Sequence, residues 1–259
     1  FLRALCDAAK GVTFPDWSEW LGRCKARQER YPPVTEEQRT QKQYVNSYHL
    51  IERLSAAAGE DVIVTDMGFA FQVTHQAWSV KRGQRLMTNC GLAAMGWGLP
   101  AAIGAAVGSG QKVISIVGDG GFMMNAQELA TIAHHKLPVK IFLLNNGGYL
   151  TMRQSQSHAF AGYMGSDEGS GLSFPDFETL VAAHGIEYER MESSRDIDGV
   201  LRRALASDGP YFVEVFMDQD QAQLPKSVNR REHGKIVQTP IEDAWPYLDR
   251  DELAENLKV

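Results

Sequence analysis

The sequence predicts an α/β fold of three layers, α/β/α, in which helices cover both faces of one mostly parallel sheet. Two observations predict it. Short apolar, β-branched runs alternate with segments of helical periodicity, and several of these runs end at Gly, Asp or Asn. Strands that alternate with helices form βαβ units, and these bury a parallel sheet on both faces. The 259 residues, 44% hydrophobic and 22% charged, suffice for one large domain with extensions.

Six segments are expected as strands, because each is a short apolar run bounded by turn residues. Their ranges are 61–66, 86–89, the first part of 112–121, 137–146, 186–191 and 210–218. Helical spacing predicts helices within 41–59, 91–110, 125–135, 174–185 and 194–207. At the start of 125–135 we expect a capping box, with Asn125 as N-cap and Glu128 three residues later.

The two ends of the chain differ from this regular pattern. Residues 1–30 are predicted to be helical with a break, and Tyr31-Pro32-Pro33 ends the second helix. We expect 1–40 to be the end of a preceding domain with a linker, 41–220 the main domain, and 221–259 a C-terminal arm. Because the chain begins with Phe1 and has no signal-peptide pattern, we expect it to start part-way through a longer polypeptide.

Composition argues against several classes of protein. The 26 Lys and Arg against 32 Asp and Glu give a net charge of −6, so there is no basic field for nucleic acid. No apolar run reaches about 18 residues, so no membrane span is expected. Three scattered cysteines favour free thiols in a reducing cytoplasm over a disulfide framework.

The most informative motif pairs a glycine turn, Gly118-Asp119-Gly120-Gly121, with Asn145-Asn146 after 23 further residues. Both ends fall where a predicted parallel strand finishes, one crossover apart. If these strands are neighbours, Asp119 and Asn146 lie about 5 Å apart at the backbone. A carboxylate and an amide oxygen can share Mg²⁺, which takes its other ligands from phosphate and water. The glycine turn can present amides to phosphate, so the motif predicts a diphosphate–Mg²⁺ site.

This motif resembles the thiamine-diphosphate motif of the acetolactate synthase and pyruvate decarboxylase superfamily. The stretches GLAAMGWGLPAAIGAA and PYFVEV are also similar to those enzymes. The resemblance covers about 45–218, so 41–220 is identified as the diphosphate- and Mg²⁺-binding domain with a thiamine-diphosphate-binding fold. Residues 1–30 resemble the end of the central domain of the same enzymes.

The resemblance implies a role for each matching position. Asp119, the side chain of Asn146 and the carbonyl of Gly148 are expected to bind Mg²⁺. The amides of Gly120 and Gly121 are expected to hold the diphosphate. Other expected cofactor contacts are Gly68, Phe69 and Ala70 in a loop lining the diphosphate, Ala93 with its carbonyl on the pyrimidine amino group, Met95 as the apolar wedge that bends the cofactor, and Tyr149 just past the site.

The activity implied by the resemblance is thiamine-diphosphate- and Mg²⁺-dependent decarboxylation of a 2-keto acid such as pyruvate, with carboligation to a second carbonyl. Two alternatives stay open: a simple 2-keto acid decarboxylase, and a cofactor-binding half-subunit that is inactive until paired. The family's activating glutamate lies in a pyrimidine-binding domain that nothing in this chain resembles. We therefore expect another domain or subunit to supply it, within a homo-oligomer, dimer or tetramer.

Three further segments were open to interpretation. Gly96–Ala101 formally matches the GxGxxA pattern of dinucleotide sites, but a proline lies inside it and the preceding strand is poor. Residues 154–173 are either an active-site lid or a plain surface loop. A basic cluster in the arm is a solvated surface or a contact for an anionic substrate or a neighbouring subunit; it comprises Lys226, Arg230, Arg231 and Lys235.

Overall fold

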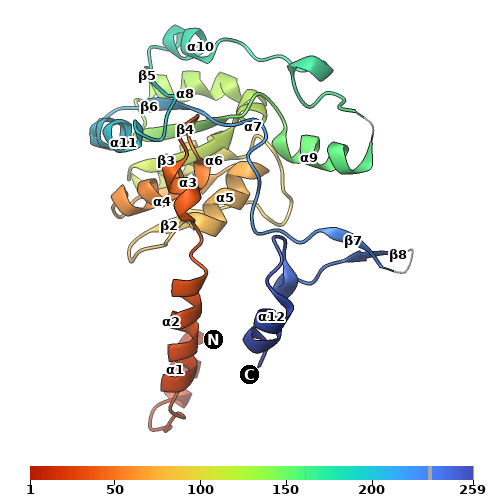
Figure 1. Cartoon of the computed structure of the whole chain (residues 1–259). Helices are drawn as coiled ribbons and strands as arrows, with labels where there is room; N and C mark the ends of the chain where they lie inside the picture. Colours follow the sequence, from red (N-terminus) through yellow and green to blue (C-terminus); the bar gives the residue numbers. More distant parts are fainter. Residues whose placement is uncertain (161, 233–234, 259) are drawn as a thin grey trace.

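A sheet of six parallel strands forms the middle layer of the protein (Figure 1). The computed structural model describes residues 1–160, 162–232 and 235–258. The strands lie in the order β2-β1-β3-β4-β6-β5, and all neighbours in this sheet are parallel. Their bounds are β1 Val62–Thr65, β2 Arg85–Met87, β3 Val113–Gly118, β4 Val139–Asn145, β5 Glu187–Met191 and β6 Tyr211–Phe216. The six predicted strands are therefore confirmed.

Helices pack on both faces of the sheet, which confirms the three-layer α/β/α architecture. One face is covered by α4 (Ser47–Ala57), α5 (Phe69–Ala77) and α11 (Ile197–Ala206). The other is covered by α6 (Gly98–Ser109), α8 (Leu129–His134) and α10 (Phe177–Ala183). The central strands β3 and β4 are consequently buried along almost their whole length.

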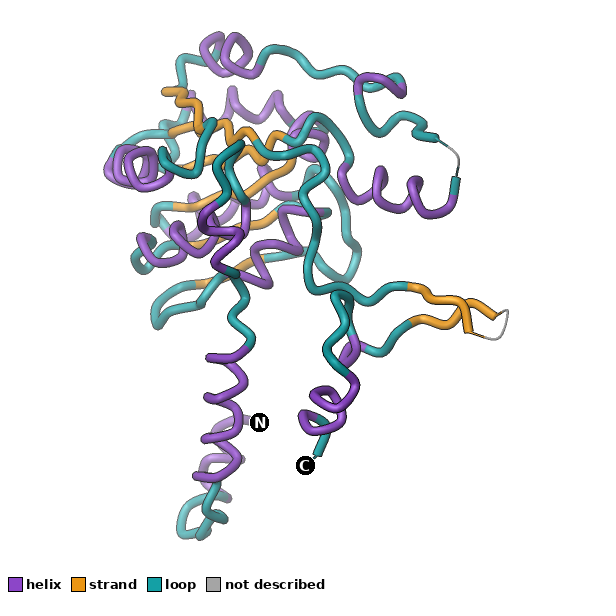
Figure 2. The backbone as a smooth tube through the Cα atoms, viewed as in Figure 1, coloured by secondary structure: helices purple, strands orange, loops and turns teal. Residues whose placement is uncertain are grey.

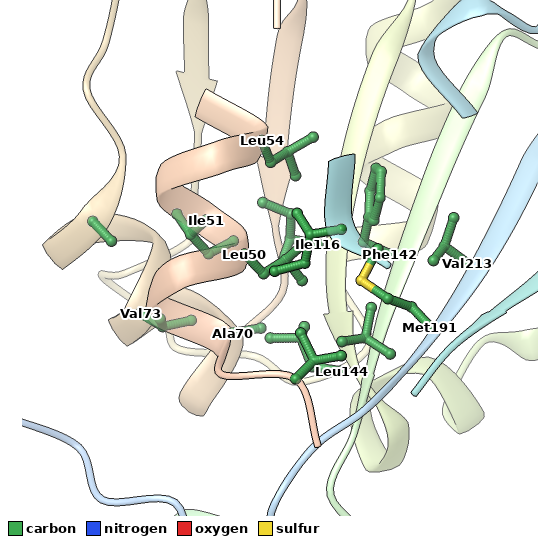
Figure 3. Close-up of a cluster of buried hydrophobic side chains, with 14 of the residues drawn as sticks. Leu50, Ile51, Leu54, Ala70, Val73, Ile116, Phe142, Leu144, Met191 and Val213 are labelled. Carbon is green, nitrogen blue, oxygen red and sulfur yellow. The ribbon is translucent and has the colours of Figure 1, made fainter. Parts of the chain in front are cut away.

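The first of the two cores lies between α4, α5 and the sheet (Figure 3). Leu50 and Leu54 of α4 point at the sheet, where Ile116 of β3 and Phe142 of β4 meet them, and all four are fully buried. Burying one such side chain contributes about 1.5–3 kcal/mol relative to leaving it exposed. Helix α4 begins where it does because the Asn46 side chain accepts the N–H of Tyr48 at 3.0 Å, as an N-cap.

Helix α5 is the main element that the sequence analysis placed wrongly. We expected Gly68, Phe69 and Ala70 to lie in a loop, but only Gly68 precedes the helix, with a φ of +75°. Phe69 and Ala70 form the first turn, because apolar residues continue at Val73 and Ala77 and bury one helical face. The aromatic ring of Phe69 packs edge-to-face on Tyr48 of α4, with 6.4 Å between centroids.

The capping box expected at Asn125 is also wrong. The segment opens with a short 3₁₀ turn, η1 (Ala126–Glu128), which leads into α8. No side-chain cap is formed, because the Asn125 amide instead donates to the carbonyl of Gly96 at 2.7 Å. The Glu128 carboxylate accepts the hydroxyl of Thr131 at 2.9 Å. Asn125 thus ties the start of this helix to the segment before α6.

The segment 154–173, interpreted as a lid or a surface loop, begins as part of a helix, α9 (Leu150–Ala159). Leu150 and Arg153 are both 3% exposed and lie three residues apart, so one helical face is buried. Among the described residues that follow α9 in this segment, Glu168–Ser170 form a 3₁₀ turn, η2, which Asp167 caps. Whether this segment acts as a lid stays a prediction.

Two extensions project from the layered body on the same side (Figures 1 and 2). The N-terminal one holds α1 (Leu2–Ala8) and α2 (Ser18–Arg30), which bury no residue, and α3 (Glu36–Thr40) follows it. The C-terminal one comprises the hairpin β7 (Asn229–Glu232) and β8 (Lys235–Gln238), the turn η3 (Ile241–Asp243) and α12 (Arg250–Asn256). Arg30 of α2 forms a 2.8 Å ion pair with Glu252 of α12, so the two extensions touch.

The division into 1–40, 41–220 and 221–259 stays a prediction. In the basic cluster, the side chains of Arg230 and Arg231 lie outside the described residues. Cys6, Cys24 and Cys90 are free thiols. Within the described ranges, no helix combines the length and the apolar character needed to cross a membrane.

Candidate cofactor and metal site

The topology of the sheet picks out the carboxyl ends of β1 and β3. The chain leaves β1 toward β2 on one side and leaves β3 toward β4 on the other, although β1 and β3 are neighbours. Ligands of open parallel sheets bind in the crevice that such a reversal creates. A buried aspartate follows each strand at this point: Asp66 after β1 and Asp119 after β3.

Asp119 lies at the junction of β3 and a short helix, α7 (Asp119–Met123), and is 1% exposed. Its Oδ1 accepts the N–H of Gly120 at 2.7 Å, and its Oδ2 accepts those of Asn146 at 3.0 Å and Gly148 at 2.9 Å. Burial raises the pKa of Asp119 to about 6, against the opposing effect of these three N–H groups. Among the described residues no side chain donates to this carboxylate, so Oδ1 keeps a lone pair for a further partner.

Asn146 lies beside Asp119 because β3 and β4 are neighbours, with Gly118 opposite Leu144. The turn after β4 depends on glycine. Gly147 has a φ of +68°, and a Cβ on Gly148 would stand 2.1 Å from the carbonyl oxygen of Ser166. The neighbour relationship that the motif required is therefore confirmed, while the ligand roles stay predictions.

The glycines of α7 are required by close packing on both sides. A Cβ on Gly120 would meet the ring of Tyr149 at 2.1 Å, and one on Gly121 would meet Oδ2 of Asp66 at 1.9 Å. Tyr149 therefore lies directly against the glycine turn. The Gly120 amide, expected to hold diphosphate, is engaged here by Asp119.

Asp66 is a site residue that the sequence analysis missed. Its Oδ1 accepts the N–H of Gly98 and its Oδ2 that of Gly96, both at 3.1 Å. Burial raises the pKa of Asp66, and the surrounding backbone N–H groups oppose the rise. The signal was present in the sequence, because Asp66 ends a β-branched run just as Asp119 does.

Ala93 and Met95 lie in the loop between β2 and α6, directly before the segment that Asp66 holds. Ala93 has a φ of +52°, an uncommon conformation for a residue with a Cβ, and its N–H donates to Asn89 at 2.8 Å. Met95 is 37% exposed in this chain, so its side chain is accessible. The glycines of the GxGxxA pattern pack against Asp66 and Met124, which explains them without a dinucleotide.

Phe69 and Ala70 are the expected site residues that the structure moves furthest from their predicted setting. Both side chains are buried in the core beneath α5. Only the backbone atoms of these two residues could therefore contact a diphosphate. Gly68, which precedes the helix, is the member of this group that stays at the carboxyl edge of the sheet.

A cavity of about 610 Å³ opens beside the Asn145–Gly148 turn. It is lined by the ends of β4 and β6 and by residues between Asp167 and Phe177. In its wall the Glu214 carboxylate accepts the Asn145 amide at 2.6 Å and the Tyr188 hydroxyl. Asn145 Oδ1 in turn accepts the N–H of Gly147 at 3.0 Å, so this half-buried network braces the turn. Burial and the bond to Glu214 raise the pKa of Tyr188.

The oxygen ligands at the carboxyl ends of β3 and β4 suit a hard divalent cation whose remaining ligands come from phosphate. The Asp119 carboxylate accepts the backbone N–H groups of Asn146 and Gly148, in a turn rich in glycine. The Asp119 carboxylate and the side-chain amide oxygen of Asn146 are both hard oxygen donors of the kind that Mg²⁺ prefers. Across the described residues no group of three or more His, Cys, Asp or Glu side chains is placed to hold a metal. A cation bound here would therefore need oxygens from a ligand as well as from the protein.

Comparison with known proteins shows the family of the chain. A family described as "Thiamine pyrophosphate enzyme, C-terminal TPP binding domain" matches residues 66–215, which begin at Asp66 and end in β6. "Acetolactate synthase 1, chloroplastic" of Zea mays is 30% identical over 232 residues, covering 86% of this chain and 36% of that protein. "Acetolactate synthase isozyme 2 large subunit" of Escherichia coli is 37% identical over 177 residues, covering 66% of this chain and 31% of that protein.

The chain spans about a third of the length of these curated relatives. The matched range contains five of the six strands and both buried aspartates. The chain thus belongs to the thiamine pyrophosphate enzymes and carries their C-terminal cofactor-binding domain.

Proposed function

We propose that this chain binds the diphosphate end of thiamine diphosphate through Mg²⁺, in an enzyme that decarboxylates a 2-keto acid such as pyruvate and joins the product to a second carbonyl. The observation that carries the proposal is the pairing of Asp119 with the Asn146–Gly148 turn, at the point where the sheet reverses direction. The names of the relatives, acetolactate synthases, favour carboligation over simple decarboxylation.

The proposed ligands of Mg²⁺ are Asp119, the amide oxygen of Asn146 and the carbonyl of Gly148. The glycine turn of α7 lies against the diphosphate, with Gly68, Tyr149 and the backbone of Phe69 and Ala70 at its border. Thiamine diphosphate supplies the electron sink for decarboxylation. This chain's residues bind its anionic diphosphate end. From the loop before α6, Met95 supports the bent cofactor and the carbonyl of Ala93 accepts its pyrimidine amino group.

The residue that activates the cofactor is proposed to come from outside this chain. A pyrimidine-binding domain or subunit would supply a glutamate, and a homo-oligomer would bring two such halves together. We also propose a cytoplasmic location, which the three free cysteines favour. The proposed boundaries place the cofactor-binding domain at 41–220, which contains the matched range 66–215.

Calorimetry tests the metal assignment. In the full-length protein, Asp119→Ala should abolish Mg²⁺-dependent binding of thiamine diphosphate, because the cation loses its charged ligand. Asp176→Ala is the control: this exposed carboxylate caps α10, so its loss should lower stability by about 1 kcal/mol and leave binding intact. Unchanged affinity in the Asp119 variant would refute the proposed site.

Product analysis tests the reaction. The full-length protein with pyruvate, thiamine diphosphate and Mg²⁺ should release carbon dioxide and form a 2-hydroxy-2-methyl-3-keto acid from two pyruvates, or a hydroxyketone when an aldehyde is supplied. Free acetaldehyde as the sole organic product would support the simple decarboxylase instead. Turnover that appears only when a second polypeptide is added would support the half-subunit alternative.

A further inference from the structure

Arg153 is a buried cation directly beside the proposed metal site, and the sequence analysis assigned it no role. It lies in α9 and is 3% exposed. Its Nη1 donates to the carbonyl of Ser166 at 3.1 Å. Its Nη2 donates to the carbonyls of Asn146 at 2.9 Å and Gln219 at 2.8 Å, and to Oδ1 of Asn146 at 3.2 Å.

These acceptors belong to three separate segments of the chain. Asn146 follows β4, Ser166 lies in the irregular segment after α9, and Gln219 follows β6. Three of the four acceptors are backbone carbonyls, which hold the guanidinium in place independently of any side chain. Only a planar, forked group with several donors in fixed directions can meet all of them together.

The bond to Oδ1 fixes which end of the Asn146 amide faces Arg153. Guanidinium groups only donate, so the amide oxygen is favoured at this position and the NH₂ group is excluded from it. The oxygen keeps a second lone pair. Asn146 can serve a hard cation through its oxygen but not through its nitrogen, so the orientation of this amide decides whether the site binds metal.

Arg153 is not explained as half of an ion pair. The ion pairs formed within the described part of the chain do not include it, and its Nε has no hydrogen-bond partner there. Its charge acts on the buried Asp119 carboxylate without an ion pair or hydrogen bond between the two side chains, and it opposes the rise in the pKa of that group. Its bonds all serve to hold backbone and one amide around the turn that follows β4.

We propose that Arg153 is a positioning residue for the metal site, which presets the Asn146 amide oxygen and the Asn146–Gly148 turn before the cation arrives. This inference rests on the proposed function, since it assumes that Asn146 binds Mg²⁺. Groups hydrogen-bonded to metal ligands commonly orient those ligands in this way. The planar fork, and not the positive charge alone, is what the positioning requires.

The test is Mn²⁺ affinity in the presence of thiamine diphosphate, measured by electron paramagnetic resonance on the full-length protein. Arg153→Lys keeps the charge but loses the fork, and should weaken Mn²⁺ binding about 10–100-fold. Arg153→Met should weaken it at least as much. Lys140→Met, which removes a fully buried cation from the interior of β4, is the control and should leave Mn²⁺ affinity unchanged.

A double variant separates positioning from a general effect on stability. Asn146→Asp replaces the amide by a carboxylate, both ends of which can bind metal, so orientation no longer matters. In that background Arg153→Lys should cause less than a threefold loss. A loss as large as in the Asn146 protein would overturn the inference, and so would wild-type affinity in Arg153→Lys or tighter binding in Arg153→Met.

Asp119→Ala in the same assay keeps this inference distinct from the proposed function. If Mn²⁺ binding survives in Asp119→Ala, the proposed metal site is wrong and the positioning role fails with it. If binding is lost in Asp119→Ala but is normal in both Arg153 variants, the metal site stands and only the role of Arg153 is overturned.

Discussion

The carboxylate of Asp66 lies against the backbone of Gly121, so closely that a Cβ on this glycine would stand 1.9 Å from Oδ2. The same carboxylate accepts the N–H groups of Gly96 and Gly98. One buried side chain at the end of β1 therefore joins the loop that carries Met95 to the helix that begins at Asp119.

Gly121→Ala should displace Asp66, because a methyl group cannot occupy the space that its carboxylate fills. We expect a loss of unfolding free energy of about 1–3 kcal/mol, with weaker binding of thiamine diphosphate. Urea denaturation and calorimetry measure the two effects. Gly104→Ala is the control: it lies in α6 with no neighbour within 4 Å, so the alanine should raise stability by about 0.5–1 kcal/mol. A stable, fully binding Gly121 variant would contradict the packing described here.

Asp66→Asn should loosen the segment from Gly96 to Gly98. An amide offers one acceptor oxygen, so one of the two backbone N–H groups loses its partner, at a cost of about 1–3 kcal/mol. Hydrogen exchange should show reduced protection of the Gly96 or Gly98 amide. Asp61→Asn, at the opposite end of β1, serves as comparison, since its Oδ2 accepts Gly59 instead. Equal protection of Gly96 and Gly98 in both variants would disagree with this assignment.

Because of Lys140, the free energy of unfolding should change with pH in the alkaline range. Burial lowers the pKa of this lysine from 10.5 to about 8, so between these values the unfolded chain binds a proton that the folded protein has released. The unfolding free energy should therefore rise between pH 8 and 10.5, by about 1–3 kcal/mol, relative to Lys140→Met, which cannot titrate. Denaturation across this range checks the sign, and parallel pH profiles for the two proteins would exclude it.

Glu252→Ala should weaken the contact between α12 and α2 without unfolding the sheet, while the contacts of Asn256 with Arg27 and Tyr31 remain. It removes the partner of Arg30 and of the Tyr31 hydroxyl, yet these contacts are largely at the surface. We expect a change in global stability of less than about 1 kcal/mol, but faster hydrogen exchange in α12. Glu255→Ala, whose carboxylate pairs with the nearby Lys258, is the matched control. If α12 exchanges equally fast in both variants, the contact with α2 does not hold it.

Much of the sheet and part of the site could be predicted from the sequence, because, as a rule, the carboxyl ends of neighbouring parallel strands lie side by side. Alternation of strands and helices predicted the six strands, and the rule placed Asp119 next to Asn146, as observed. The same rule applies to Asp66, which ends the predicted strand 61–66, but no second motif accompanied it and it was assigned no role. Its partners are backbone N–H groups about 30 residues away, which no side-chain pattern reveals.

Two features were not predicted. Arg153 is a single basic residue in a stretch rich in Ser and Gln, and its acceptors are mainly backbone carbonyls, which leave no trace in residue types. The first turn of helix α5 was assigned to a loop because the family resemblance places a loop there, although apolar residues continue at helical spacing to Val73 and Ala77. In both cases tertiary packing decided the outcome, because burial of one helical face fixed the position of the element.

The shared carboxylate of Asp66 has a mechanical consequence. Gly96 donates to it and Gly121 packs against it, so a displacement of the loop before α6 would also disturb the contact with the first turn of α7. A ligand that contacts both the loop before α6 and the start of α7 would therefore bind to two segments that are already fixed relative to each other. Such preorganisation lowers the entropic cost of binding.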